Sequence, residues 1–431
     1  MQRTISQFFI DDIAKFKQQL LCWSQQFETA IFLDSNNYQQ QYTSFDAVIA
    51  VDEFTSIKTD FHNAFGKLQE YQTTTKDYIF GYISYDVKND NEQLSSNNFD
   101  GLDFADLFFF QPQKIIFIEG NIVEFQYLKM VDNEMENDFA KIQQSNNYEI
   151  QQSTTDIKIK LRTHKDEYQE KVAAILQHIH RGDIYEANFC QEFYAENTEI
   201  NPLKVYQDLN NISEPPFAVF LKINHHYLLS ASPERYIRKE GNKIISQPIK
   251  GTAKRLKSKF DDEKIASDLA KDAKERSENV MIVDLVRNDL SKSAIKGSVK
   301  VEELCKVYSF KQVHQMISTV VCEIDEKITP IKVLKDTFPM GSMTGAPKVS
   351  AMKIIEKYEN TRRGLYSGAV GYFTPNGNFD FNVVIRSILY NQEKKYVSYS
   401  VGSAITAKSN PEKEYEECLL KAKAMKFVLS K

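Results

Sequence analysis

The sequence predicts an α+β fold, in which strands and helices are segregated along the chain. Apolar runs of strand length dominate residues 1–142, and long helical patterns are concentrated in the later part of the chain. A doubly wound parallel sheet is not indicated, because strands and helices do not alternate in a regular βαβ order. With 431 residues the chain is long enough for two or three domains of ordinary size, and it can bury a substantial core.

The composition is that of an ordinary globular protein, with 42% hydrophobic and 26% charged residues. The 54 lysines and arginines against 59 acidic residues give a formal charge of -5, which offers no general attraction for nucleic acid or an anionic membrane. We therefore expect neither partner. The five cysteines are widely spread without a C-x-x-C pair, and the N-terminus has no apolar stretch typical of a signal peptide or membrane span. These features favour a cytoplasmic protein.

The N-terminal region, residues 1–142, is expected to be rich in sheet, and a polar linker is expected at residues 143–160. The linker is predicted from the run QQSNNYEIQQSTT, in which Gln, Asn, Ser and Thr displace aliphatic residues. The strands expected before it are apolar or alternating runs, the last of them containing a hairpin turn at residues 119–121: 29–33, 78–85 and 114–125.

The remaining residues, 161–431, carry the candidate catalytic residues. A helix over 165–180 places its apolar side chains on one face and ends before Gly182. Periodicity predicts further helices at 261–286, 348–358 and 411–429. The strands expected in this region are apolar or alternating runs: 184–193, 217–223, 227–230, 243–246, 369–373, 382–389 and 395–401.

Two of the predicted helices carry pairs of carboxylates. Glu414 and Glu417 fall on one face of the last helix together with Lys421, and Glu275 and Glu278 precede an apolar run in an earlier helix. A carboxylate at the edge of a buried segment is costly unless it is paired or bound to a cation. Mg²⁺ is commonly held by one or two carboxylates, waters and an anionic substrate group, which glutamates from two helices could supply. The alternative for the last helix is a solvated face with an ordinary Glu–Lys pair.

Lys250 is a candidate nucleophile. It is enclosed by Pro248, Ile249 and Gly251, and partial burial there would lower its pKa and make the neutral amine accessible. The alternative is a loop lysine whose aliphatic stem covers apolar surface while its ammonium group reaches water. The segment SPERY places Glu234 sixteen residues earlier in the chain.

A glycine-rich stretch, FPMGSMTGAPKV, precedes the helix expected at 348–358. Gly341 and Gly345 lie just before a helix start near Pro347, and exposed N–H groups at such a turn can hold a carboxylate or a phosphate. The stretch matches neither of the usual glycine patterns of nucleotide sites, so a nucleotide ligand is not expected.

Eight segments, in this order, resemble the chorismate-utilising enzymes, which include the large subunits of anthranilate and aminodeoxychorismate synthases and their isochorismate and salicylate synthase relatives. The segments are GDIYEANFCQEF, SPERY, PIKGTAKR, ENVMIVDLVRNDLSK, VHQMIST, GSMTGAPKVSAMKII, SGAVGYF and EKEYEECLLKAKA. The similarity extends from Lys165 to the C-terminus. It implies a β-α-α-β sandwich of two sheets with helices between them, to which both halves of the chain contribute strands.

The lysine in PIKGT resembles that of aminodeoxychorismate synthase component I, because anthranilate synthases usually have alanine at this position. The resemblance implies that Lys250 attacks C2 of chorismate while Glu234, as general acid, assists loss of the C4 hydroxyl. Ammonia then enters at C4 and expels the lysine, which gives 4-amino-4-deoxychorismate on the route to 4-aminobenzoate and folate. Anthranilate synthase or another chorismate-utilising enzyme, such as isochorismate synthase, is the alternative. A homologue that binds a ligand without catalysing a reaction is a second alternative.

The resemblance also implies the remaining site residues. Mg²⁺ is expected on Glu278 and Glu417, with Glu275 and Glu414 as support. His314 is expected near the substrate ring or its leaving group, with a hydrogen-bonded core histidine as the alternative. The residues expected to contact the substrate, most of them at its second carboxylate, are Arg386, Tyr372, Lys421, Gly341, Ser342, Gly402, Ser403 and Thr252.

Ammonia handling is where this sequence departs from the resemblance. Glu186 stands where amine-adding relatives usually carry glutamine and water-adding relatives carry a lysine base, so a negative charge is expected close to the ammonia site. We expect Glu186 to bind ammonium or ammonia. No segment of the chain resembles a glutamine amidotransferase, so ammonia from glutamine is expected to come from a separate subunit.

Overall fold

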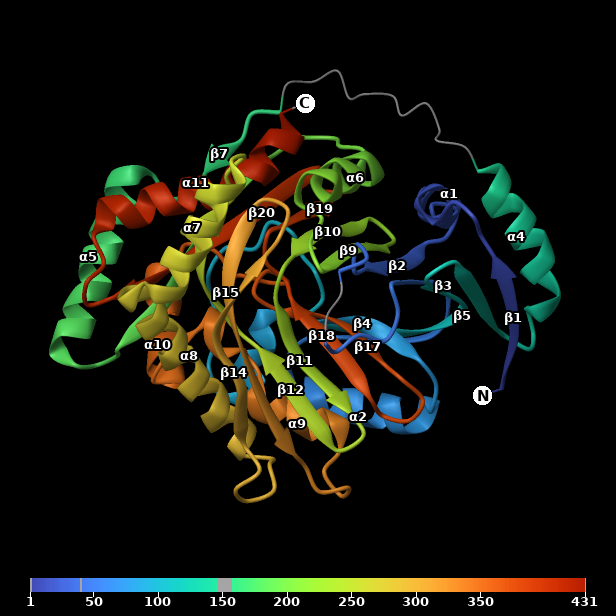
Figure 1. Ribbon diagram of the computed structural model, residues 1–431, viewed down its shortest axis with the longest axis horizontal. Helices are drawn as coiled ribbons and strands as arrows, with labels where there is room; N and C mark the ends of the chain where they lie inside the picture. Colours follow the sequence, from blue (N-terminus) through green and yellow to red (C-terminus); the bar gives the residue numbers. More distant parts are fainter. Residues whose placement is uncertain (1, 39–40, 146–156, 431) are drawn as a thin grey trace.

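The computed structural model describes residues 2–38, 41–145 and 157–430, and its strands form one continuous hydrogen-bonded system (Figure 1). Two sheets meet in this system at the long strands β3 (Ala47–Thr59) and β5 (Leu107–Glu119). β5 pairs with β4 through residues 107–110 and with β6 through residues 114–119, and β3 pairs with β5 along both parts. One strand pair therefore belongs to both sheets.

The first sheet contains β3 and β5 and strands from both halves of the sequence. Its other strands, in the order of their pairing, are β1 (Arg3–Phe9) and β6 (Ile122–Leu128) on one side, then β2 (Thr29–Asp34), β9 (Phe217–Ile223), β10 (His226–Ser232), β19 (Ser387–Asn391), β20 (Tyr396–Thr406) and β8 (Glu186–Ala195) on the other. The short strands β7 (Lys160–Leu161) and β16 (Gly345–Ala346) both pair with β8.

The second sheet continues from β5 and carries the SPERY and PIKGT segments. Its strands, in the order of their pairing, are β4 (Ile79–Ile83), β17 (Ala369–Phe373), β18 (Phe379–Val383), β11 (Arg235–Glu240), β12 (Lys243–Gln247), β15 (Val313–Glu323) and β14 (Lys300–Ser309). β13 (Ile249–Lys254) pairs with β15 beyond the end of β12. All pairings between these strands are antiparallel.

The helices cover the outside of the two sheets (Figure 1). Those packed with the first sheet are α1 (Ile13–Ser24), α4 (Met135–Gln144), α5 (Lys165–Arg181), α6 (Pro202–Ser213), α10 (Lys348–Tyr358) and α11 (Pro411–Leu429). Those packed with the second are α2 (Ala64–Thr75), α7 (Lys259–Lys271), α8 (Ala273–Ser291) and α9 (Pro330–Thr337), and a short helix, α3 (Lys88–Asn91), lies in the connection after β4.

The α+β class is confirmed, and the order of the layers differs from the expected one. On β9, Phe220 packs in a core with α1, α5, α6 and α11, whereas Val219 and Leu221 pack in a second core that includes both sheets. The two sheets thus face each other, and the order is α-β-β-α with the helices outside. The reason is that the inner faces of both sheets are apolar and bury each other, so the helices are left to cover the outer faces.

The two halves of the sequence form one folded unit. β2 from the first half pairs with β9 from the second, and β4 pairs with β17. The expected regions 1–142 and 161–431 therefore share both sheets. Of the linker expected at 143–160, residues 146–156 lie outside the described residues, and α4 continues to Gln144. Within the described ranges no helix is long and apolar enough to cross a membrane.

Candidate active site

Lys250 lies on β13 and points toward β8. Its ammonium nitrogen donates a hydrogen bond to Oε1 of Glu186 at 2.9 Å, and the two side chains are 13% and 1% exposed. The lysine is therefore enclosed, as expected for a nucleophile, and does not reach into water as the alternative required.

The protonation of Lys250 differs from the expectation. Burial lowers its pKa, but the charge and hydrogen bond of Glu186, with the charges of Glu278 and Glu234, outweigh burial and raise the pKa above its ordinary value. Burial alone predicted an accessible neutral amine. Glu186 was expected at the ammonia site, and its direct contact with the Lys250 amine, with the effect of its charge on the lysine, was missed. The resting side chain is an ammonium group.

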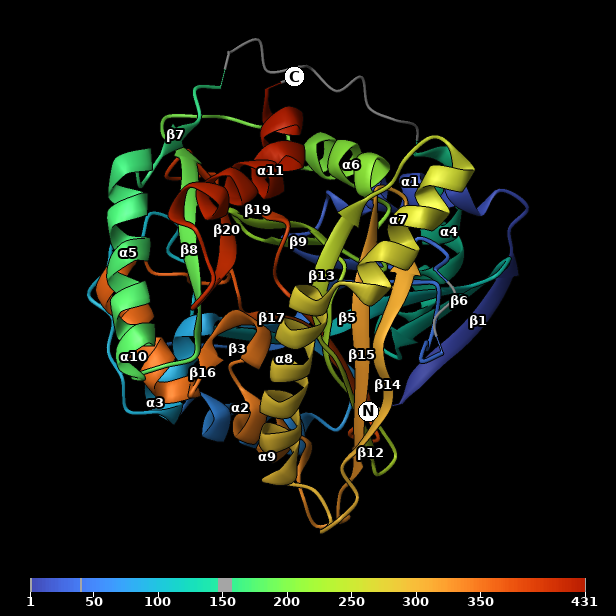
Figure 2. The same cartoon turned by 60° about the vertical axis from the view of Figure 1, so that its left-hand side comes forward.

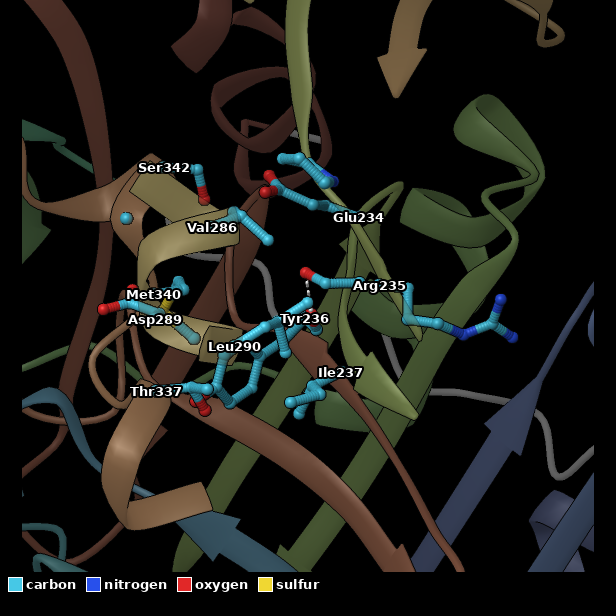
Figure 3. Close-up of a pocket in the computed structure, with 13 residues that line it drawn as sticks. Glu234, Arg235, Tyr236, Ile237, Val286, Asp289, Leu290, Thr337, Met340 and Ser342 are labelled. Atoms are coloured by element: carbon cyan, nitrogen blue, oxygen red, sulfur yellow. Dashed lines mark hydrogen bonds between the residues drawn. The ribbon is translucent and has the colours of Figure 1, made fainter. Parts of the chain in front are cut away.

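Glu234 lies between β10 and β11 and is suited to act as an acid. It is 5% exposed, and burial raises its pKa to about 7, although a hydrogen bond from the Ser342 side chain and the charge of Lys250 act in the opposite direction. Figure 3 shows Glu234 and Ser342 beside each other at one end of a cavity of about 20 Å³. A carboxyl group with this pKa can hold a proton near neutral pH and release it to a substrate.

The loop that carries Ser342 packs directly on α8. A Cβ added at Gly341 would lie 2.6 Å from Cδ2 of Leu285, so glycine allows the close approach. A lysine at the start of α10, whose side chain is 9% exposed, ties the same loop to α8. The Nζ of Lys348 donates to Oδ2 of Asp289 on α8 and to the carbonyl oxygens of Thr337 and Pro339.

Four carboxylates influence one lysine near α8 and α11, two helices that come forward in Figure 2. Burial lowers the pKa of Lys274, but the charges of Glu278, Glu275, Glu414 and Glu417 raise it overall. The two predicted pairs of carboxylates are thus brought together from separate helices. β13 is adjacent, because a Cβ added at Gly251 would lie 3.2 Å from Oε2 of Glu275.

The donor set at this point suits a hard divalent cation. Burial raises the pKa of Glu278 to about 7, and Glu275 and Glu186 add to the effect against Lys250 and Lys274. A cation would lower the cost of an ionised Glu278. No group of three or more metal-binding side chains converges in the part of the chain that the structure describes. A site built on Glu278 and Glu417 fits Mg²⁺, which takes few protein carboxylates and completes its shell with water and substrate oxygens.

Arg386 and Lys421 lie together beside these carboxylates. Lys421 pairs with Glu417 at 2.6 Å and donates to the carbonyl oxygen of Gly402 at 2.9 Å, and Arg386 donates to the carbonyl oxygen of Lys421 at 3.3 Å. The hydroxyl of Ser403 donates to Glu414. The predicted Arg386, Lys421, Gly402 and Ser403 therefore form a basic and polar wall next to the carboxylates.

Residues 28–427 of this chain match the protein family described as chorismate binding enzyme. The chain belongs to the chorismate binding enzymes. This chorismate binding enzyme is 40% identical over 253 residues to aminodeoxychorismate synthase component 1 of Escherichia coli (strain K12), which is 59% of this chain and 55% of the relative. It is 39% identical over 261 residues to anthranilate synthase component 1 of Aquifex aeolicus (strain VF5), which is 61% of this chain and 52% of the relative.

The matched part of this chorismate binding enzyme thus spans about half the length of these curated relatives. Among solved structures, anthranilate synthase component I from Streptococcus pneumoniae TIGR4 superimposes with a TM-score of 0.76 at 22% identity, covering 90% of this chain and 94% of that chain. At this identity the likeness shows the fold.

Tyr372 does not join the site in this chorismate binding enzyme. It lines a separate cavity of about 60 Å³ with Phe45 and Asp380, and a hydrogen bond from Ser44 acts on its hydroxyl. Tyr366, six residues earlier, is the tyrosine that lies close enough to Arg386 to affect its pKa. Tyr366 lies before β17 and Tyr372 lies on it, and both are buried, so nothing in the sequence marked which of them lies near Arg386.

His314 and Thr252 lie on the neighbouring strands β15 and β13. The ring of His314 is 2% exposed and is held by the Ser309 hydroxyl at 2.8 Å and by Oδ1 of Asp262 at 3.0 Å. This is the environment of a hydrogen-bonded core histidine, the alternative considered for it. Thr252 is exposed on β13, opposite Gln315 of β15. Among the described residues, neither makes a hydrogen bond or ion pair with Lys250 or Glu234, and their roles toward the substrate stay predictions.

Three residues of the site were not found from the sequence. Tyr366 lies beside Arg386, Lys274 lies among the four carboxylates, and Lys348 holds the loop of Ser342 against α8. Lys274 and Lys348 both lie inside segments that carry other site residues, and two lysines next to buried acids are a signal that the sequence offered.

Proposed function

We propose that this protein aminates chorismate at C4 with ammonia to give 4-amino-4-deoxychorismate, through a covalent intermediate on Lys250. The observation that carries the proposal is the enclosed Lys250 amine, which has an acid partner in Glu234 and lies near the carboxylates of α8. The 40% identity to aminodeoxychorismate synthase component 1 of Escherichia coli supports the same reaction.

The proposed reaction consists of two displacements. The Lys250 amine, after it loses a proton, forms a bond to C2 of chorismate while the C4–O bond breaks, and Glu234 gives its proton to the departing hydroxyl so that water leaves. Ammonia then forms a bond to C4 while the bond from C2 to Nζ breaks and the electron pair returns to the lysine. Each step forms one C–N bond. Lys250 is recovered as the amine, and the ammonium group formed on C4 returns a proton to Glu234, which is then the acid again.

The remaining residues would bind and orient the substrate. We propose Glu278 and Glu417, supported by Glu275 and Glu414, as the site of Mg²⁺, which would neutralise the ring carboxylate of chorismate. Arg386 and Lys421 would bind the second carboxylate, with N–H groups near Ser342. When glutamine is the nitrogen source, we propose that a separate glutamine amidotransferase subunit delivers the ammonia. The product would serve 4-aminobenzoate and folate synthesis.

The test is the product formed from chorismate, Mg²⁺ and ammonium, identified by mass and absorbance. We expect 4-amino-4-deoxychorismate from the natural sequence and a loss of roughly a thousandfold or more in Lys250→Ala, as is usual when a covalent nucleophile is removed. Lys254→Ala, an exposed lysine on the same strand, is the matched control and should retain activity. Direct formation of anthranilate would overturn the proposal, and unchanged turnover in Lys250→Ala would exclude the covalent route.

A further inference from the structure

Lys250 lies in an irregular part of β13. Ile249 of β13 pairs with Ile317 of β15. The next pair is Thr252 with Gln315, so β13 has one residue more than β15 between the two pairs. Such a β-bulge disrupts the hydrogen-bonded ladder and leaves the extra residue without its usual partner. We call residues 249–252 the β13 bulge, and its backbone groups require partners from outside the ladder.

Asn279 of α8 provides such a partner. α8 lies beside β13, β14 and β15 (Figure 2). The Nδ2 of Asn279 donates to the carbonyl oxygen of Lys250 and to that of Met316 on β15, both at 3.2 Å. Asn279 is 1% exposed, so water does not compete for these hydrogen bonds. One buried amide group therefore connects the β13 bulge and the neighbouring strand to α8.

The amide of Asn279 is itself held in one orientation. Its Oδ1 accepts from the hydroxyl of Ser318 at 2.5 Å and from the thiol of Cys305 at 3.6 Å. The Ser318 hydroxyl in turn accepts from the N–H of Cys305 at 2.9 Å. The register of β14 against β15 also shifts here, between Glu303 and Lys306. Because both N–H groups and both lone pairs of the amide are used, the side chain of Asn279 is fixed against both irregular strands.

Asn279 directly follows Glu278, the proposed metal ligand, on α8. One helical turn therefore carries both the carboxylate at which the substrate would be held and the amide that holds the backbone of Lys250. A site built on a helix is positioned more precisely than a site on a loop. The relative position of substrate and nucleophile thus depends on this one turn of α8.

We infer that Asn279 is a positioning residue for the Lys250 amine, which it holds at bonding distance from C2 of chorismate by fixing the β13 bulge to α8. The inference rests on the proposed function. The role is indirect, because Asn279 acts through the backbone of Lys250. Attack requires reacting atoms about 3 to 3.5 Å apart, and a misplacement of about 1 Å can cost about 100-fold in rate. A displaced bulge would therefore slow the attack and leave the binding of chorismate intact.

The test is the rate of adduct formation in Asn279→Leu, which keeps the approximate size of the side chain and removes its hydrogen bonds. The adduct on Lys250 is followed by protein mass after chorismate and Mg²⁺ are added without ammonium. We expect the rate at saturating chorismate to fall roughly 10- to 100-fold. The chorismate concentration that gives half of this rate should stay within about twofold, because the variant loses attack and not substrate binding.

A second measurement uses neither chorismate nor Mg²⁺. Amide hydrogen exchange of residues 249–254 should become faster in Asn279→Leu, because the β13 bulge loses its connection to α8. Unchanged exchange in this segment would overturn the inference, since Asn279 would then not fix the bulge.

Asn391→Leu is the matched control for the loss of a buried amide. Asn391 of β19 is 2% exposed, and its Nδ2 donates to the carbonyl oxygen of Leu102 at 2.8 Å. It lies on the first sheet, whereas β13 pairs in the second. We expect both variants to lower the thermal midpoint of unfolding, but Asn391→Leu should form the adduct at the natural rate. Equal losses of rate in the two variants would overturn the inference, because the rate would then follow stability.

Ser318→Ala keeps the inference testable if Asn279→Leu does not fold. It removes the hydroxyl that donates to Oδ1 and allows the amide of Asn279 to turn. We expect the rate of adduct formation to fall roughly 2- to 10-fold, the usual effect of one neutral hydrogen bond, with the half-saturating chorismate concentration unchanged. A natural rate in folded Asn279→Leu, or in Ser318→Ala where Asn279→Leu is unfolded, would overturn the inference.

The proposed function and this inference fail in different ways. If the natural sequence forms no adduct with chorismate and Mg²⁺, the covalent route is overturned and the inference with it. If the natural sequence forms the adduct and Asn279→Leu forms it equally fast, only the inference is overturned.

Discussion

At the scale of single residues, the pKa of an enclosed group depends on its charged neighbours as well as on burial. Lys250 and Glu234 are both enclosed, and burial acts against the charged form of each. For Glu234 burial prevails and its pKa rises to about 7, whereas for Lys250 the carboxylate of Glu186 prevails and the amine stays protonated. The acid is thus prepared for its role, and the nucleophile depends on a proton acceptor.

The pKa of Glu234 leads to a prediction for the pH dependence of adduct formation. The neutral form of Lys250 increases with pH, whereas the acid form of Glu234 is lost above a pH of about 7, so the rate of adduct formation should rise with pH and level off at about 7. The hydrogen bond from Ser342 lowers this pKa. In Ser342→Ala the pKa of Glu234 should rise, and the pH at which the profile levels off should move higher.

The measurement is the rate of adduct formation as a function of pH, followed by protein mass. Ser267→Ala, an exposed serine on α7, is the control and should leave the profile in place. A profile of Ser342→Ala that stays where it is, or moves to lower pH, would contradict the assignment of Glu234 as the acid.

At the scale of elements, the sequence predicted most strands and helices of the second half, and it missed two interruptions that shape the site. The helical pattern over 261–286 is broken at Asp272, whose side chain accepts from the N–H groups of Lys274 and Glu275 and so caps α8. The apolar run over 382–389 is divided between β18 and β19, and Arg386 has a φ of 53° between them. Periodicity continues through both points, so only the tertiary structure reveals them.

Both interruptions place charged groups. The new start of α8 directs Glu275 and Glu278 toward the carboxylates of α11, and the turn at Arg386 brings its guanidinium to the backbone of Lys421. The sequence motifs identified most of the site residues. They did not identify the residues on other helices and strands that contact them. Lys274 is close in the chain to Glu275 and Glu278, but sequence spacing contains no information on its approach to Glu414 and Glu417 of α11.

The helix pair α8 and α11 leads to a prediction for metal binding. Glu417→Gln should raise the Mg²⁺ concentration needed for half-maximal activity by about tenfold or more, which corresponds to at least about 1.4 kcal/mol. Titration of activity with Mg²⁺ measures it. Glu416→Gln, the neighbouring exposed glutamate on α11, is the control and should not change the titration. Equal Mg²⁺ requirements in the two variants would exclude Glu417 as a ligand.

At the scale of the whole molecule, the site depends on strands from both halves of the sequence. Lys250 and Glu234 lie on or beside the second sheet, which reaches the first half of the chain through β17 and β4, and Glu186 lies on the first sheet, which does so through β9 and β2. The sequence placed all candidate catalytic residues in 161–431. The shared sheets mean that this region does not form the site alone.

This dependence predicts how the two halves behave as separate chains. A fragment of residues 157–431 lacks the partners of β9 and β17, which leaves two strand edges unpaired and exposes apolar residues such as Phe220 and Phe373. We expect it to lack near-ultraviolet circular dichroism and to show no cooperative thermal transition. Co-expressed with residues 2–145, it should copurify with that chain and recover both signals, because all the pairings between β2 and β9 and between β4 and β17 can then form. Cooperative unfolding of the 157–431 fragment by itself would show that the second half is an independent domain and that the first half is an addition to a complete site.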